Sequence, residues 1–486
     1  MMDLSAHPQP AEEASEQEGA EGALTGTEII DLMLSVLSDG LDHPELWTQI
    51  PAFALLVPDF PQRLATRLDH ERGERERLSL CLILAVTQAA AGMPHEMVAH
   101  LQPLAVGHSQ SPLVQGALFH IHGLADPDNP KYRLEGKICP APFVQLDVLE
   151  RSTHQCCASW LQTSAGDLSV SDADAVWNSE NAQAVRASVH DGSYRHCNKM
   201  ACPKIQADDL APAFEAARWS DAWRAIVEGA LTALPTGPET VNLAYDRTCN
   251  LSCPSCRTEK WAADEETRVR FDEMQQRAIL PLLKNARTVF VTGSGDPFAS
   301  KNFRRLMTQL DAENYPDLRF QIMTNAMLFT PKQWEAFPTL HGRVKTMKIS
   351  IDAATGPTHE LLRRGARWPV MLENMAYAGK LRAAGLIEHV ELVFTVQSEN
   401  YREMGDAVTL MDQVGASGIY FARITNWGTF DDAGYARKAV FLPGHVEHGD
   451  FLTAMQDARL RRPEVILGDL HAFIDTPIEE HRSFAA

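Results

Sequence analysis

The stretch TVNLAYDRTCNLSCPSCRTEKW, residues 240 to 261, joins a short apolar run to a group of cysteines. Its first seven residues alternate in polarity and are rich in β-branched and aromatic side chains, a composition typical of a β-strand. Cys249, Cys253 and Cys256 follow at once with C-x3-C-x2-C spacing, and no cysteine comes after Cys256. The pattern predicts three thiols on one loop at the carboxyl end of a strand.

Five later segments have the same strand-like composition, and helical patterns separate them. Alternating strands and helices are typical of parallel βαβ units, so residues 237–430 are expected to form an α/β core, a partial (β/α)6 barrel. Ligands bind beyond the carboxyl ends of the strands in such folds, which is where the cysteine loop should lie. The six expected strands are 240–246, 287–295, 318–326, 344–352, 389–397 and 418–425.

The three thiols could serve as zinc ligands, as disulfide partners or as ligands of an iron–sulfur cluster. The odd total of nine cysteines favours thiols or metal ligands over disulfides. Zinc needs four ligands, and C-x3-C-x2-C supplies three, so a zinc site would need a distant fourth residue. Three thiolates can instead hold three corners of a [4Fe-4S] cube and leave the fourth iron open.

The cysteine spacing at the end of the first barrel strand resembles that of the radical S-adenosylmethionine (SAM) enzymes. This resemblance implies a [4Fe-4S] cluster bound to Cys249, Cys253, Cys256 and SAM. It also implies reductive cleavage of SAM to a 5′-deoxyadenosyl radical, which abstracts a hydrogen atom from a substrate. An electron donor such as flavodoxin or ferredoxin would then be a partner.

Further positions are similar to SAM-contacting residues of that family. TGSGDPF, after the second strand, resembles its glycine-rich turn, and an arginine of LLRRGARW resembles one that pairs with the SAM carboxylate. One departure is Ser255, where the family often has an aromatic residue, so Leu251 is a candidate to contact adenine instead. The resemblance implies SAM contacts at Gly293, Ser294, Gly295, Asp296, Pro297, Asn325, Ser350, Asp352, Arg363 and Gln397.

The remaining segments differ in composition from this core. We expect a disordered acidic tail at 1–24, an α-helical domain at 25–127, a cysteine-rich module at 131–205, a helical connector at 206–236 and an extension at 431–486. The module resembles the SPASM and twitch modules of radical SAM enzymes, although these usually follow the barrel. By that likeness Cys139, Cys156, Cys197 and Cys202 would bind an auxiliary [4Fe-4S] cluster, with a zinc site as the alternative.

Several functions remain open at this point. The first is oxidation or epimerisation of a small polar or sugar-like metabolite, with Cys157 as a possible hydrogen donor in the epimerisation. The second is modification of a peptide or protein, and the third is a non-catalytic metal-binding scaffold. A net charge of −20 argues against a nucleic-acid partner. With no apolar run long enough to span a membrane and no signal sequence, we expect a cytoplasmic protein without a membrane partner.

Overall fold

The computed structural model describes residues 24–476. These residues divide into two compact units, with the boundary between Arg133 and Leu134. The expected acidic tail lies, apart from Leu24, outside the described residues. The finer boundaries expected from the sequence stay a prediction.

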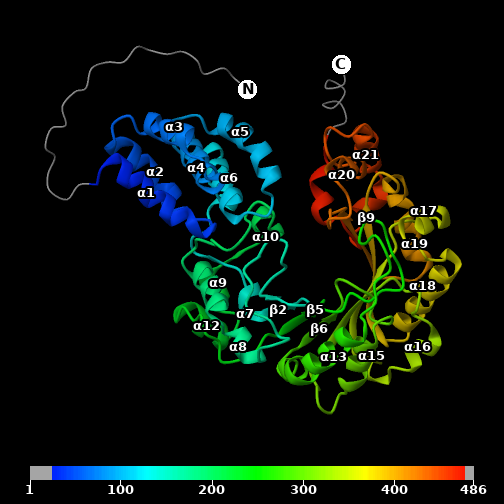
Figure 1. The fold of residues 1–486 in the computed structure, drawn as a ribbon. Helices are drawn as coiled ribbons and strands as arrows, with labels where there is room; N and C mark the ends of the chain where they lie inside the picture. The colour runs from blue at the N-terminus through cyan, green and yellow to red at the C-terminus, as the bar shows by residue number, and fades with distance from the viewer. Residues whose placement is uncertain (1–23, 477–486) are drawn as a thin grey trace. The chain divides into compact units, whose positions relative to one another are not determined.

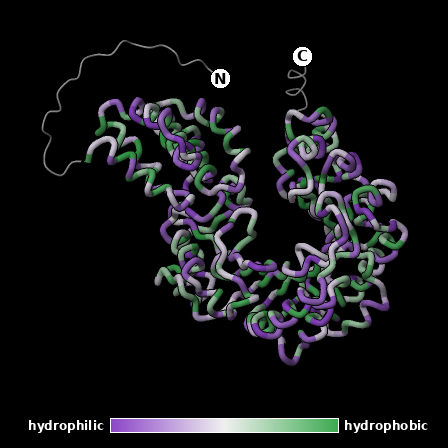
Figure 2. The backbone as a smooth tube through the Cα atoms, viewed as in Figure 1, coloured by the Kyte–Doolittle hydropathy of each residue, from purple (hydrophilic) through white to green (hydrophobic). Residues whose placement is uncertain are grey.

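The N-terminal unit consists of helices, whose polar and apolar stretches alternate along the chain (Figure 2). Helix α4 is its centre and packs against the five others, burying Leu80, Leu82, Ile83 and Val86. Because other helices surround α4 on most sides, its run LSLCLILAV is apolar and has only a narrow polar face. The helices are α1 (Gly26–Val36), α2 (Pro44–Leu56), α3 (Phe60–His70), α4 (Glu74–Ala90), α5 (Pro94–Gly107) and α6 (Pro112–Ala125).

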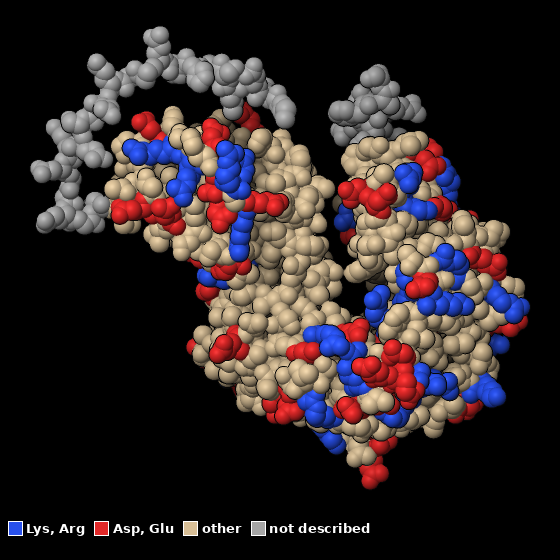
Figure 3. Space-filling model, in the orientation of Figure 1, with Lys and Arg blue, Asp and Glu red and all other residues tan. Residues whose placement is uncertain are grey.

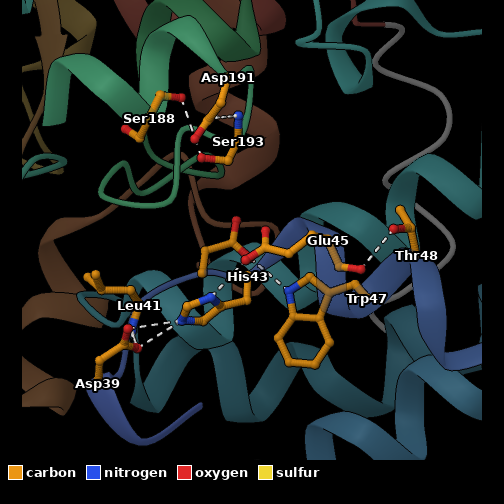
Figure 4. A network of polar contacts seen from close by, with 10 residues as sticks. Asp39, Leu41, His43, Glu45, Trp47, Thr48, Ser188, Asp191 and Ser193 are labelled. Carbon is orange, nitrogen blue, oxygen red and sulfur yellow. Dashed lines mark hydrogen bonds and ion pairs between the residues drawn. The ribbon is translucent and has the colours of Figure 1, made fainter. Parts of the chain in front are cut away.

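A polar network organises the start of α2 (Figure 4). The His43 ring lies 3.0 Å from the Asp39 carboxylate through Nε2 and 3.0 Å from Glu45 Oε1 through Nδ1. Trp47 Nε1 donates to the buried Asp42 carboxylate at 2.7 Å. The network satisfies polar groups where the chain enters the helix, so a structural role accounts for it.

The second unit is built on one sheet of nine strands, in the order β11-β10-β9-β8-β7-β6-β5-β2-β3. All neighbouring pairs are parallel except β2 with β3. The strands are β2 (Gln145–Val148), β3 (Thr153–His154), β5 (Thr240–Leu243), β6 (Thr288–Val291), β7 (Arg319–Thr324), β8 (Val344–Ser350), β9 (Ile387–Val396), β10 (Gly418–Arg423) and β11 (Val465–Ile466).

Helices connect the successive parallel strands and lie along one side of the curved sheet (Figure 1). They are α13 (Glu265–Met274), the π-helical turn η3 (Gln275–Ile279), α14 (Leu280–Leu282), α15 (Lys301–Gln309), α16 (Pro331–Glu335), α17 (Gly356–Leu362), α18 (Trp368–Ala383) and α19 (Met404–Gln413). Acidic and basic side chains are interspersed over the face of these helices seen in Figure 3. One ion pair joins Arg305 of α15 to Asp272 of α13. After β10 come α20 (Asp432–Lys438) and α21 (His448–Ala454). The expected α/β core with six parallel βα strands is confirmed.

The cysteine-rich segment is joined to this sheet. Its strand β2 pairs with β5, so Val148 lies beside Leu243, and the Ala244 N–H donates to the Val148 carbonyl at 2.8 Å. Helices α7 (Ala141–Val144), α8 (Ala173–Trp177), α9 (Glu180–His190), α10 (Pro203–Gln206), α11 (Ala213–Ala216) and α12 (Asp221–Glu228) and the short strand pair β1 (Lys137–Ile138) and β4 (Ala211–Pro212) complete the segment. The segment is therefore an extension of the sheet on the β5 side.

A fully buried arginine holds the segment together. The Arg186 guanidinium donates to the carbonyl oxygens of Pro142, Trp177 and Thr232 and stacks over the Trp177 ring at 4.4 Å. Burial lowers its pKa to about 9. Because three separate stretches of chain meet at this one cation, its loss would leave several buried carbonyls unpaired.

Candidate active site

A cavity of about 220 Å³ opens at the carboxyl ends of β5 to β10. The loop after β5 supplies the three cysteines of the C-x3-C-x2-C motif, and each following strand end supplies at least one more side chain. The lining residues are Cys249, Leu251, Cys253, Ser255, Cys256, Arg257, Gly293, Ser294, Gly295, Met323, Thr324, Asn325, Ser350, Asp352, Arg363, Thr395, Ile424, Thr425 and Trp427. The structure thus brings together most of the positions expected from the sequence.

The backbone is strained at three of these strand ends. Thr292 follows β6 with φ 73°, Ala326 lies two residues after β7 with φ 56°, and Asp352 lies two residues after β8 with φ 53°. Side chains other than glycine rarely adopt positive φ, and such strain concentrates at functional sites where the surrounding contacts enforce it. The strained residues mark the rim of the cavity.

The cysteine loop folds as a compact turn. Cys256 and Arg257 donate their backbone N–H groups to the Cys253 carbonyl, and Cys249 donates to the Trp261 carbonyl. Burial raises the pKa of the Cys249 thiol to about 11 and also raises that of Cys253. The free thiols are therefore protonated at neutral pH, whereas a bound metal would favour their thiolate forms.

The donor set fits an iron–sulfur cluster with one open position. Cys253 is close enough to both Cys249 and Cys256 for their charges to interact, and all three side chains face one cavity. Among the described lining residues there is neither a fourth cysteine nor a histidine. Across residues 24–476, no three cysteine, histidine or acidic side chains are arranged to hold a single metal ion.

The glycine turn after β6 packs directly against the cysteine loop. A Cβ at Gly295 would lie 2.6 Å from the Thr248 carbonyl oxygen and 2.7 Å from that of Asp246. Ser294 Oγ donates to the Ala244 carbonyl at 2.6 Å, and the Asp296 N–H donates to the Thr248 carbonyl at 2.9 Å. Only glycine permits this approach at position 295.

Asp296 was expected against the SAM ammonium group, but its side chain is used within the fold. The carboxylate accepts from Thr324 Oγ1 at 2.7 Å, from the Asn325 N–H at 2.9 Å and from the Phe298 N–H at 3.0 Å. Burial raises its pKa. Asp296 is not among the lining residues, so it connects the ends of β6 and β7 behind the cavity wall.

Two other expected SAM contacts lie away from the cavity lining. Pro297 follows Asp296 in the same turn, and Gln397 is buried next to Asn400. The Gln397 N–H donates to Asn400 Oδ1 at 2.8 Å, and Asn400 Nδ2 donates to the Asp352 carbonyl. Gln397 therefore supports the rim residue Asp352 through Asn400.

Asp352 and Arg363 form an ion pair in the cavity wall. Arg363 Nη2 lies 2.9 Å from Asp352 Oδ2, with the two side chains 12% and 4% exposed respectively. Asp352 Oδ1 also accepts from the Thr395 N–H at 2.8 Å, whereas Arg363 Nε is buried and has no hydrogen-bond partner. Buried charges are stable only when paired, so the pair holds the loop after β8 against β9.

Asn325 connects the end of β7 to the cysteine loop. Its Nδ2 donates to Asn250 Oδ1 at 2.9 Å and lies 3.6 Å from Cys249 Sγ. The Met327 N–H donates to Asn325 Oδ1, which fixes the amide orientation. The side chain therefore contacts both the first cysteine, Cys249, and its neighbour Asn250.

The sequence reasoning missed seven lining residues. Two of them, Arg257 and Trp427, have the largest side chains, and the others are Met323, Thr324, Thr395, Ile424 and Thr425. Arg257 follows the last cysteine and is 8% exposed. Trp427 lies in the loop after β10 and is 65% exposed at the cavity. Asn426 braces that loop by accepting from the Gly428 N–H and donating to the Phe430 carbonyl. Neither residue belongs to a local pattern that distinguishes it from ordinary loop residues.

The second group of cysteines is also brought together. The Cys197 thiol is close enough to Cys139, Cys156 and Cys202 for each to raise its pKa, although burial is the larger cause. Burial raises the pKa of Cys139 to about 11 and that of Cys156 to about 12. The Trp160 indole donates to Cys156 Sγ at 3.1 Å. The four predicted auxiliary ligands thus form one group of partly buried thiols, and their role stays a prediction.

The histidines near this group have other partners. The His154 ring bonds to the Leu161 carbonyl and Ser152 Oγ, His190 Nε2 lies 3.1 Å from the Leu231 carbonyl, and His196 Nδ1 lies 2.9 Å from Thr163 Oγ1. These contacts explain their burial without a metal.

Residues 246–410 match the family model of the radical SAM superfamily, so this part of the chain is a radical SAM domain. No curated protein sequence matches the chain. No helix among the described residues is long and apolar enough to cross a membrane.

Solved structures with similar folds share little sequence with the chain. The Streptococcus suis SuiB structure with precursor peptide SuiA is 14% identical with TM-score 0.29, over 42% of this chain and 43% of that one. TYW1 with a bound lysine-pyruvate adduct is 12% identical with TM-score 0.30, over 47% and 72%. AnSMEcpe with AdoMet and the Kp18Cys peptide is 15% identical with TM-score 0.32, over 47% and 63%. The match thus spans less than half of the SuiB chain.

Proposed function

We propose that the chain is a radical SAM enzyme whose cysteine loop binds a [4Fe-4S] cluster together with SAM. The observation that carries this proposal is the convergence of Cys249, Cys253 and Cys256 on a cavity that contains no other cysteine or histidine among its described lining residues. Three thiolates leave one iron available to a ligand. When bound and reduced, the cluster would supply one electron for cleavage of SAM, and the product would abstract a hydrogen atom from the substrate.

Residues at the ends of several strands would each bind a different part of SAM. The turn Gly293–Ser294–Gly295 presents backbone groups at the cavity, suited to accept from an ammonium group. Arg363 offers a guanidinium for a carboxylate, although its partner Asp352 already occupies part of it. Ser350 and Asn325 add polar groups at the same rim, and Leu251 and Trp427 add apolar surface. The combination suits a ligand that is charged at one end and aromatic at the other.

We further propose that Cys139, Cys156, Cys197 and Cys202 bind an auxiliary [4Fe-4S] cluster. Four partly buried thiols that interact electrostatically support it, because neutralising that many thiolates requires a cationic centre. A fully ligated cluster has no open iron, so it would transfer electrons, and the net reaction would be an oxidation. The alternative outcome is epimerisation with Cys157 as the hydrogen donor; Cys157 is not among the lining residues of the main cavity.

The substrate we propose is a small polar molecule, since the lining of the cavity includes Thr395 and Thr425 in addition to the residues assigned to SAM. A peptide is the second candidate. Soluble donors such as flavodoxin or ferredoxin would supply the electron, and the protein would act in the cytoplasm.

The test is production of 5′-deoxyadenosine by the anaerobically reconstituted chain with SAM and dithionite. We expect product from the parent and none from a Cys253→Ala variant that retains its fold by circular dichroism. Product from the variant at the parent rate would contradict the proposal. Faster production of 5′-deoxyadenosine with sugar nucleotides would favour a small polar substrate. Faster production with short peptides would favour a peptide.

A further inference from the structure

Arg257 joins three parts of the candidate active site through one guanidinium. Nη1 donates to the Arg247 carbonyl at 2.7 Å, at the start of the cysteine loop. Nη2 donates to the Ser294 carbonyl in the glycine turn and lies 3.4 Å from Cys256 Sγ, at the end of the loop. The side chain therefore spans the loop that carries the thiols and the turn beside them.

The charge on this guanidinium is not balanced by a carboxylate. Within the described part of the chain, no ion pair of Arg257 with an acidic side chain is found, in contrast to Arg363, which pairs with Asp352. Arg257 is 8% exposed, so water screens its charge little. A buried cation needs a compensating negative group, and the thiolates facing the same cavity would provide it.

We infer that Arg257 is a positioning residue that holds Cys256 in place and raises the reduction potential of the cluster. This inference rests on the proposed function. One-electron reduction adds one negative charge to the cluster, and a fixed cation hydrogen-bonded to a ligand sulfur stabilises the more negative form. The electron comes from an external low-potential donor, dithionite in the test below. Arginine suits the position because its planar fork reaches two carbonyls and a sulfur at once.

Arg364 provides a matched control from the other side of the loop. Its Nε donates to the Ser252 carbonyl and to Ser252 Oγ, and Nη2 donates to the Thr258 carbonyl. Like Arg257, it fastens the cysteine loop through backbone carbonyls. No hydrogen bond from Arg364 to a cysteine sulfur is found among the described residues. A purely structural effect should therefore appear in variants of both arginines.

The experiment measures the midpoint potential of the cluster in the reconstituted full chain. An anaerobic redox titration follows the part of the electron paramagnetic resonance (EPR) signal that SAM alters, in the parent and in the Arg257→Gln, Arg257→Met, Arg257→Lys and Arg364→Gln variants. We expect the uncharged Arg257 variants to disfavour reduction about tenfold, which for one electron corresponds to a potential lower by roughly 59 mV. Arg257→Lys should retain most of the parent potential, and Arg364→Gln should retain all of it.

Iron content decides the outcome if the uncharged variants do not keep the cluster. Loss of iron in Arg257→Gln and Arg257→Met, with normal iron in Arg257→Lys and Arg364→Gln, supports the role of the charge. Equal shifts in Arg257→Gln and Arg364→Gln, or iron loss in Arg257→Lys as well, would overturn it. A parent chain that binds iron but shows no SAM-dependent signal would instead contradict the proposed function.

Discussion

The close approach of Gly295 to the cysteine loop predicts how much an added methyl group at this position destabilises the protein. In Gly295→Ala the new methyl carbon would start 2.6 Å from the Thr248 carbonyl oxygen, and it must move roughly 0.8 Å to reach the ordinary contact limit of 3.4 Å. The crowded atoms belong to backbone on both sides, so no side chain can rotate away. The turn and the loop must separate.

The expected cost follows from the contacts that separation disturbs. Overpacking a buried position costs roughly 1–3 kcal/mol. Weakening the hydrogen bond from the Asp296 N–H to the Thr248 carbonyl adds about 1 kcal/mol. The free energy of unfolding should therefore fall by about 2–4 kcal/mol.

Gly293→Ala is the control for this substitution because its methyl carbon would meet only the Ala244 Cβ, at 3.8 Å. Urea unfolding of the cluster-free protein, followed by tryptophan fluorescence, measures both variants. We expect Gly293→Ala to be as stable as the parent or more stable by up to ~1 kcal/mol. Iron bound after reconstitution should fall in Gly295→Ala, since the loop carrying Cys249 is displaced. A Gly295→Ala protein with parent stability and parent iron content would refute the reasoning.

Three further predictions concern other parts of the second unit. Serine substitution at Cys139 should reduce bound iron from about eight to about four per chain, whereas Cys157→Ser should keep the parent count, as measured by iron and sulfide analysis. Burial lowers the pKa of His359 to about 4, and the nearby Arg363 cation adds to this effect. Because the unfolded chain takes up the proton at higher pH than the folded protein, the free energy of unfolding should fall by about 2 kcal/mol from pH ~7 to ~5. Urea unfolding of His359→Gln should not show this loss, and a similar loss in that variant would contradict the prediction. Trp427→Ala should weaken binding of S-adenosylhomocysteine about tenfold in equilibrium dialysis, and Trp219→Ala, with a similarly exposed indole outside the cavity lining, should not change it.

Much of the core could be predicted from the sequence because its signals are local. Alternation and β-branched residues mark each of the six strands from β5 to β10, and the cysteine spacing lies within one loop. Strands β3 and β11 have two residues each, too few for a clear period. The pairing of Val148 with Leu243 joins residues far apart in sequence, so local patterns do not contain it.

The site was predicted less completely than the core because side-chain direction depends on backbone torsions. The positive φ of Thr292 starts the turn that sends Asp296 toward β7, where it accepts hydrogen bonds from Thr324 and Asn325. The occurrence of an acidic residue after a glycine-rich stretch does not predict the direction of its side chain. Arg257 likewise acquires its position from a contact with the Ser294 carbonyl in a distant turn, which composition and spacing do not encode.

The central claim is that three cysteines hold a cluster whose remaining position accepts SAM. The most direct measurement is EPR spectroscopy of the reduced, reconstituted chain before and after addition of SAM. We predict that SAM changes one component of the signal and that this component is missing in a Cys256→Ser variant. A signal that SAM leaves unchanged, or a SAM-dependent component that persists in Cys256→Ser, would contradict the account.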